Sequence, residues 1–140
     1  MSPIIPVNAM KLRLLIACAS LLLFSCKKSN DAAPGVGYPK EVTIEYKLTT
    51  VKGSVATVEM VGYTNESDGR TTLTNVSLPF SKTLKRTVKY GDMTTLSVFH
   101  NNTGGAYSVK MEILVNGKVA KTQTEETTNH LNGAIVHPFQ

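Results

Sequence analysis

The sequence predicts an all-β protein, in which an antiparallel two-sheet β-sandwich of about seven to eight strands follows a leader and a flexible segment. Residues 41–49 and 107–113 alternate between apolar and polar side chains, which is the period of a strand with one buried face. Turn-forming residues recur about every ten residues, as in sandwiches and small barrels. Threonine is frequent beyond residue 42, and no helical period occurs there. The sandwich is favoured, and a small barrel is the alternative.

The first two strands differ in how clearly they are marked. Residues 41–49 keep one apolar face throughout. In the second strand, residues 55–64, we expect Ala56, Val58 and Met60 to point inward. The apolar phase then changes across Gly62, and a glycine at a phase change suggests a β-bulge.

Turn signals separate the remaining strands. Residues 65–69 are rich in side chains that tolerate tight backbone conformations, and Pro79 interrupts strand pairing, as expected at an edge or corner. Asn116-Gly117 is the strongest hairpin signal, because both turn positions need a positive φ. The other strands are expected at residues 71–78, 81–90, 94–100, 107–115, 118–125 and 133–139.

A basic and apolar segment precedes the predicted sandwich. Lys11 and Arg13 supply a positive end. Residues 14–24 form an apolar run in the length range of a signal-peptide core, too short to span a bilayer comfortably. The segment therefore predicts export from the cytoplasm. Met10 stands directly before it and makes a more natural start than Met1, so we expect translation to begin at Met10.

The end of this segment, Leu23-Phe24-Ser25-Cys26, resembles the lipobox of bacterial lipoproteins. The resemblance implies cleavage between Ser25 and Cys26, and covalent attachment of diacylglycerol and acyl lipid to the Cys26 thiol. An acylated chain is held in a membrane because each buried methylene contributes about 0.8 kcal/mol. Two alternatives stay open: a plain secretory peptide with an incidental cysteine, and a short uncleaved anchor.

These interpretations divide the chain into three parts. Residues 1–25 are expected to be the signal peptide, residues 26–40 a lipid-anchored flexible linker, and residues 41–140 the sandwich domain. The linker is polar, contains glycine and proline, and shows no hydrophobic period, which is typical of a flexible tether.

Composition and motifs exclude several kinds of chemistry. Loss of the leader, with two cations and no acid, lowers the formal charge from +5 to +3, which is too mild to indicate nucleic-acid binding. Cys18 leaves with the leader and Cys26 carries lipid, so no disulfide is expected. His100, His130 and His137 lack metal-site spacing, and no nucleophile elbow, carboxylate pair or phosphate loop occurs. We expect no enzyme activity, no metal, and no cofactor beyond the lipid on Cys26.

One predicted strand, residues 81–90, is dense in positive charge. Its cations are Lys82, Lys85, Arg86 and Lys89. Alternation along a strand places Lys85 and Lys89 on one face, and Lys82 and Arg86 on the other. Interleaved cations commonly guard an exposed sheet edge against pairing with other chains, and this interpretation is favoured. The alternative is a docking edge for an acidic or extended partner.

Short motifs spaced along residues 41–121 carry a family resemblance. They are Val42-x-Ile44-x-Tyr46, Ala56-Thr57-Val58, Tyr63-Thr64-Asn65, Asp68-Gly69, Leu78-Pro79-Phe80 and Met111-x-Ile113-x-Val115-Asn116-Gly117-Lys118. In this order they resemble the MmpS family of small membrane-anchored proteins. The resemblance implies an immunoglobulin-like sandwich outside the membrane, and an accessory role beside an RND-type transporter that exports lipids or siderophores. Here a lipid is expected in place of that family's transmembrane helix.

The expected function is that of a lipid-anchored lipoprotein in the cell envelope of a Gram-negative bacterium. The outer membrane or periplasmic face is favoured over the inner membrane. The sandwich is expected to act as a binding or accessory module for another envelope protein, and the MmpS resemblance makes an RND-type transporter the implied partner. A small-ligand carrier and a structural surface lipoprotein without a partner are the alternatives.

Overall fold

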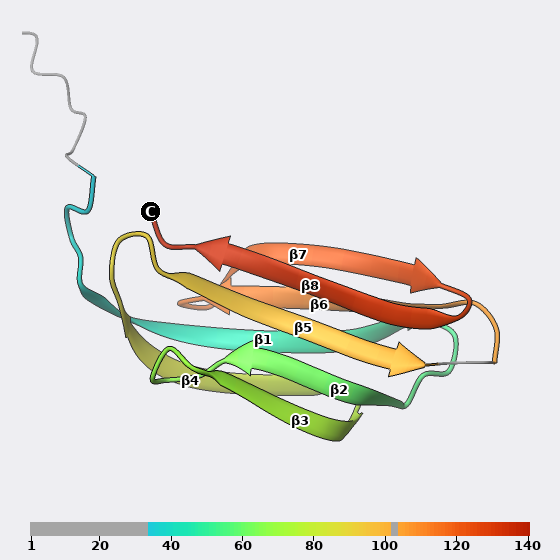
Figure 1. Cartoon of the computed structure of the whole chain (residues 1–140). Helices are drawn as coiled ribbons and strands as arrows, with labels where there is room; N and C mark the ends of the chain where they lie inside the picture. The colour runs from blue at the N-terminus through green and yellow to red at the C-terminus, as the bar shows by residue number, and fades with distance from the viewer. Residues whose placement is uncertain (1–33, 102–103) are drawn as a thin grey trace, which may run out of the picture. The chain divides into compact units, whose positions relative to one another are not determined.

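The computed structural model describes residues 34–101 and 104–140. Within these residues the chain is all-β, with eight strands and no helix (Figure 1). The expected signal peptide, most of the expected linker, and Ser25 and Cys26 lie outside the described residues. The strands are β1 (Lys40–Lys52), β2 (Thr57–Thr64), β3 (Arg70–Ser77), β4 (Phe80–Val88), β5 (Met93–Asn101), β6 (Tyr107–Val115), β7 (Lys118–Thr127) and β8 (His130–Pro138).

The strands form two antiparallel sheets that pack face to face. Sheet A has the order β4-β1-β6-β7, and sheet B has the order β3-β2-β5-β8. This arrangement confirms the predicted sandwich. β4 lies beside β1, as strand E lies beside strand B in an immunoglobulin sandwich. β5 lies beside β2, as strand F lies beside strand C in that fold. The β6–β7 hairpin takes the place next to β1 that strand A has in that fold.

The core lies between the sheets and collects alternate side chains from the strands. Ile44, Tyr46, Leu96 and Met111 are completely buried, with no exposed surface. Complete burial of one large aliphatic side chain contributes about 1.5–3 kcal/mol relative to leaving it exposed. The apolar alternation that predicted β1 and β6 is therefore the main source of stability in these strands.

The second strand departs from its predicted phase. Met60 points outward and is 37% exposed, and Ala56 is exposed just before the strand begins, whereas the sequence predicts both to point inward. Gly62 pairs regularly with Ser97, so the predicted bulge at this glycine is wrong. The phase changes earlier, between Val58 and Val61, where Asn75 on the neighbouring strand adopts a left-handed φ of 53°. That backbone irregularity lies on β3, so the sequence of β2 alone did not reveal its position.

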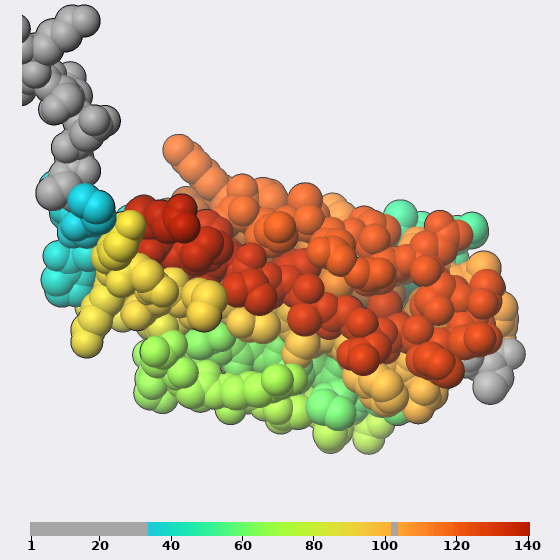
Figure 2. All heavy atoms as spheres, turned by 45° about the horizontal axis from the view of Figure 1, so that its top comes forward, coloured from blue at the N-terminus to red at the C-terminus, as the bar shows by residue number. Residues whose placement is uncertain are grey.

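The antiparallel connections give the sandwich two distinct ends. The four odd-numbered strands begin at one end of the sandwich, and the four even-numbered strands finish there. We call this the tether end. The first described residues, the β4–β5 turn and the C-terminus gather there, as Figure 2 shows in blue, yellow and dark red. We call the opposite end the distal end; it carries the β1–β2, β3–β4 and β7–β8 connections.

Candidate partner-binding face

The four cations singled out from the sequence do not share one environment. All belong to β4, an edge strand of sheet A, or to the turn after it. Lys85 is exposed and lies 3.5 Å from Glu41, Lys82 is half-buried on the inward side, and Lys89 is exposed beyond the strand. Arg86 is 3% exposed and is directed between the sheets. A partner edge on β4 would therefore consist of the three lysines.

Arg86 joins two turns at the tether end. Its guanidinium donates to the main-chain oxygen of Met93 at 3.1 Å, forms an ion pair with Asp68, and lies 3.5 Å from Asp92. Because an unpaired buried charge would cost several kcal/mol, these partners are needed to keep Arg86 inside. Asp68 belongs to the β2–β3 turn and Asp92 to the β4–β5 turn, so Arg86 fixes both turns relative to β4.

The β2–β3 turn is also held from within. The Asn65 side-chain oxygen accepts hydrogen bonds from the main-chain N–H groups of Ser67, at 3.1 Å, and Gly69, at 2.9 Å. Asparagine is favoured in turns because its side chain can satisfy such donors. This turn leads directly into Arg70, the first residue of β3, and so sets where the Arg70 side chain starts.

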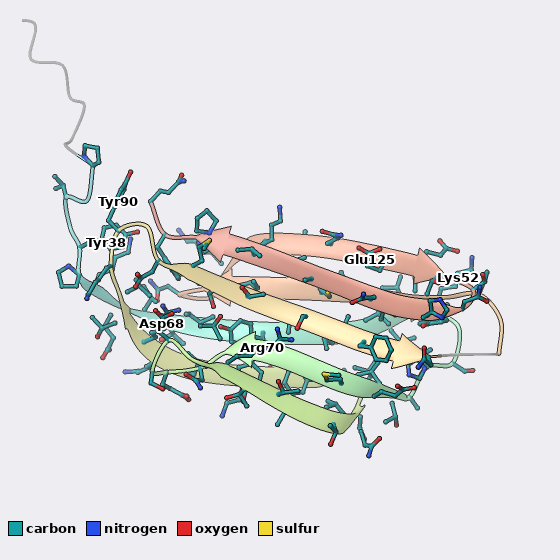
Figure 3. All side chains as sticks on the ribbon, in the orientation of Figure 1. Tyr38, Lys52, Asp68, Arg70, Tyr90 and Glu125 are labelled. Atoms are coloured by element: carbon teal, nitrogen blue, oxygen red, sulfur yellow. The ribbon has the colours of Figure 1, made fainter. Side chains whose placement is uncertain are left out.

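Arg70 lies across the outer surface of sheet B. Its guanidinium passes over Gly62 of β2 and donates to the hydroxyl oxygen of Ser97 on β5 at 2.9 Å. A Cβ atom added at Gly62 would lie 2.6 Å from the Arg70 terminal nitrogen and 2.7 Å from the Ser97 oxygen. The missing side chain at Gly62 is therefore what lets the guanidinium lie against the sheet. Arg70 is labelled in Figure 3.

Two shallow hollows flank this arginine. One, of about 170 Å³, lies toward the β2–β3 turn and is lined in part by Thr64, Asp68 and Thr95. The other, of about 210 Å³, lies on the other side and includes Met60 and Phe99. Asp68 borders the first hollow, but its charge is engaged by Arg86. Arg70 thus separates a polar hollow from a more apolar one.

The surface around Arg70 is almost free of charge. We call it the sheet B face, and define it by twelve outward side chains of the four strands, leaving out those at the outer ends of β5 and β8. These are Arg70, Thr72 and Thr74 of β3, Met60, Gly62 and Thr64 of β2, Thr95, Ser97 and Phe99 of β5, and Asn132, Ala134 and Val136 of β8. Arg70 forms no ion pair within the described part of the chain. Its guanidinium has five N–H donors, and the bond to Ser97 uses one of them.

A buried tyrosine supports this face from the inner side. The Tyr46 hydroxyl of β1 donates to the main-chain oxygen of Thr64 at 2.8 Å and is hydrogen-bonded to the Thr94 hydroxyl. The Thr64 hydroxyl in turn accepts the N–H of Thr95 at 3.0 Å. Burial raises the pKa of Tyr46, so the phenol stays protonated at neutral pH. This chain of bonds links sheet A to sheet B below the first hollow.

We also looked for metal-ligand clusters and for unpaired titratable groups in the described part of the chain. Residues 34–101 and 104–140 contain no cluster of three or more His, Cys, Asp or Glu side chains that could hold an ion. At the distal end, the Nδ1 atom of His100 is buried without a hydrogen-bond partner, and its ring centroid lies 5.7 Å from that of Tyr107. Burial raises the pKa of the Tyr107 phenol. Neither group is paired with a second group that would form a catalytic couple.

Comparison with models of known protein families and with curated protein sequences finds no match to this chain. Among the described residues, no helix is both long and apolar enough to cross a bilayer.

Sequence reasoning did not single out Arg70, Gly62 or Ser97. For Gly62 the sequence predicts a bulge and not a part in a binding face. The three residues meet only through the register of β2 with β3 and β5, which sets Gly62 opposite both Thr72 and Ser97. A small residue inside a strand was the available signal, because such a glycine can also mark a close approach by another group.

Proposed function

We propose that this protein is a lipid-anchored envelope lipoprotein whose sandwich binds another envelope protein through the sheet B face. The observation that carries the proposal is the combination of Arg70, held against the sheet without an ionic partner among the described residues, with an otherwise uncharged surface. Arginine on such a surface is typical of protein interfaces, where it is enriched while lysine and the acids are depleted.

The arrangement favours a partner with a carboxylate on an otherwise neutral surface. A carboxylate can accept two parallel N–H bonds from one guanidinium, which gives both strength and orientation. Thr72, Thr74 and Asn132 supply further hydrogen-bonding groups around it, and Met60 and Phe99 supply apolar contact. An RND-type transporter is the partner class that the MmpS resemblance implies.

A small-ligand carrier is the alternative, and the size of the hollows disfavours a ligand site on the sheet B face. Pockets for small molecules usually enclose about 300–1,000 Å³ and bury most of the ligand. The two hollows of the sheet B face, about 170 and 210 Å³, are smaller than this and open to solvent. They suit side chains of a protein partner better than a whole ligand.

Site-specific photo-crosslinking in living cells tests the binding face. The crosslinker replaces Thr72 on the sheet B face or, as a matched control, Thr83 on sheet A; both threonines are exposed and lie on edge strands. We expect one recurrent envelope protein, identified by mass spectrometry, to be captured from position 72 and not from position 83. The Arg70→Glu variant should lower that yield about tenfold, because it sets two carboxylates against each other.

The same experiment separates the alternatives. No adduct from position 72 after saturating irradiation would favour a structural lipoprotein without a partner. Equal adducts from both positions would contradict a specific role for the sheet B face.

The anchor has a separate test. The Cys26→Ser variant should lose both labelling by a fatty-acid probe and removal of the leader, because the thiol is the acceptor for the lipid. Continued labelling of this variant would overturn the lipid anchor while leaving the binding face in place.

A further inference from the structure

We propose that the tether end of the sandwich docks onto the membrane surface, with Tyr38, Tyr90 and Met93 in the headgroup region and nearby lysines on anionic headgroups. The proposal rests on the lipid anchor at Cys26 proposed above, and it adds an orientation. The domain would stand on its tether end and turn its sheet faces sideways.

The aromatic residues at this end form one cluster fixed to the sandwich. The rings of Tyr38 and Tyr90 meet edge to face, with centroids 6.0 Å apart. The Tyr38 hydroxyl donates to the main-chain oxygen of Gln140 at 3.1 Å. The Lys40 ammonium lies 4.1 Å from the centre of the Tyr38 ring. Tyr38 is therefore part of the folded end, although the sequence placed it in the flexible linker.

This cluster leaves a large apolar surface exposed. Tyr90 is 48% exposed, Met93 59% and Val36 68%, and they are three of the seven large apolar residues exposed in the described chain. They are neighbours, because Gly35 lies against Tyr90 and Met93 follows the same turn. Figure 3 labels Tyr38 and Tyr90 beside each other at this end. Tyrosine is enriched at membrane surfaces because its ring is apolar and its hydroxyl is polar.

The charges at the tether end match an anionic surface. Lys40, Lys89 and Lys118 are exposed there, and none forms an ion pair with a described residue. The carboxylates of Asp68 and Asp92 at this end are engaged by Arg86, and Glu66 in the β2–β3 turn is a further exposed acid there, outnumbered by the three lysines. At the distal end, by contrast, Lys52 is paired with Glu126. Unpaired lysines near a membrane are attracted to anionic lipid headgroups within a Debye length.

The length of chain between Cys26 and the sandwich also favours membrane docking through the tether end. From Cys26 to Pro34, the first described residue, the chain can reach at most about 30 Å. Strand β1, with 13 residues, extends over about 43 Å. The tether end therefore lies within reach of the anchoring membrane at all times, whereas the distal end reaches it only if the sandwich lies on its side.

Single tryptophans report which end touches lipid, because the chain contains no tryptophan of its own. The lipidated full-length protein carries either Tyr90→Trp at the tether end or Val51→Trp at the distal end; the replaced side chains are 48% and 59% exposed. Each variant is reconstituted into phosphatidylcholine vesicles, with and without phosphatidylglycerol, that contain brominated lipid as a quencher. We expect Tyr90→Trp to be quenched at least about threefold more than Val51→Trp, and more strongly when phosphatidylglycerol is present.

The outcomes separate the orientation from the anchor. Protein that floats with the vesicles while the two tryptophans are quenched equally, or not at all, overturns the docking and leaves the lipid anchor intact. Protein that does not float overturns the anchor, and the docking with it. A further variant with Lys40, Lys89 and Lys118 all changed to Gln should lose the extra quenching caused by phosphatidylglycerol; if that extra quenching persists, the role of the lysines is wrong.

Discussion

The outer faces of the two sheets are opposite in character, although both are solvent-exposed surfaces of one small sandwich. The face of sheet A is covered with charges that satisfy each other. Its pairs are Glu41 with Lys85 at 3.5 Å, Glu45 with Lys47 at 3.2 Å, and Lys110 with Glu112 at 3.2 Å. The face of sheet B carries threonine, serine, methionine and phenylalanine around the single guanidinium of Arg70.

This difference separates a surface suited to water from one suited to a partner. Exposed ion pairs such as Glu41–Lys85 contribute little stability, typically below about 1 kcal/mol, but they keep a sheet hydrated. A neutral surface loses little hydration when a partner covers it, and its single fixed charge can set the orientation. The predictions below test whether the sheet B face depends on the buried groups that support it.

The largest expected effect is at Arg86, between the two sheets. The Arg86→Leu variant should lower the free energy of unfolding by about 2–3 kcal/mol, because the partly buried Asp92 and the Met93 carbonyl lose their donor, whereas Asp68, whose side chain is 63% exposed, can be hydrated. Urea denaturation measures the loss. The turn that leads into Arg70 should also loosen, and amide hydrogen exchange at Gly69 should speed up. A loss below about 1 kcal/mol would show that Arg86 does not hold the turns.

A smaller effect is expected at Tyr46. The Tyr46→Phe variant removes the phenol that hydrogen-bonds to the Thr64 carbonyl and the Thr94 hydroxyl, and should cost about 1–2 kcal/mol. Thermal unfolding at pH 7 provides the measurement. The matched change Tyr90→Phe removes an exposed hydroxyl and should be nearly neutral, so equal losses in the two variants would contradict a supporting role for the Tyr46 hydroxyl.

The same tyrosine predicts a pH dependence at the alkaline side. Burial raises the pKa of Tyr46 above its ordinary value of 10.0. Above that pH the unfolded chain loses a proton that the folded chain keeps, so the contribution of Tyr46 to stability is constant below about pH 10 and falls as pH rises above it. The fall should be smaller in Tyr46→Phe, and part of it should remain, because burial also raises the pKa of Tyr107. Identical pH profiles would refute this assignment.

Gly62 offers a way to alter the sheet B face with little loss of stability. The Gly62→Ala variant places a methyl group where the Arg70 guanidinium and the Ser97 hydroxyl now lie, so Arg70 must move off the sheet. Because these neighbours are flexible side-chain ends, the unfolding free energy should change by less than about 1 kcal/mol. Crosslinking from position 72 should nevertheless fall, as we also expect for Arg70→Glu. Unchanged crosslinking would show that the position of Arg70 is unimportant.

The smallest effect is expected at Lys85, which directly precedes Arg86 in the chain. The Lys85→Gln variant breaks an exposed pair with Glu41 and should cost less than about 0.5 kcal/mol. Denaturation under the conditions used for Arg86→Leu makes the comparison direct. A cost similar to that of Arg86→Leu would mean that the sheet A face is also a structural network.

The strands were predictable from sequence because their signals are local. Period-two alternation and turn residues such as Asn116-Gly117 placed all eight strands close to their observed bounds. The candidate site was not predictable, because it depends on register between strands. Arg70 and Ser97 are 27 residues apart and meet only over Gly62.

Arg86 shows a second limit of sequence reasoning. Alternation places it on the more apolar side of the strand, with Leu84 and Val88, but alternation does not say whether a cation on that side is buried. An isolated cation in a strand is usually exposed, and the two acids that allow its burial lie in turns on either side of β4 in the sequence. Met60 shows the converse case, since an apolar residue predicted inward faces solvent.

The position of β1 has a mechanical consequence. The strand that continues from the tether is not at an edge of its sheet; it is paired with β4 along residues 40–48 and with β6 along residues 44–52. Any pull between a membrane anchor and a bound partner enters the domain through this doubly held strand. The load is then shared by many hydrogen bonds that are stretched together. A strand peeled from an edge would instead lose its hydrogen bonds one after another.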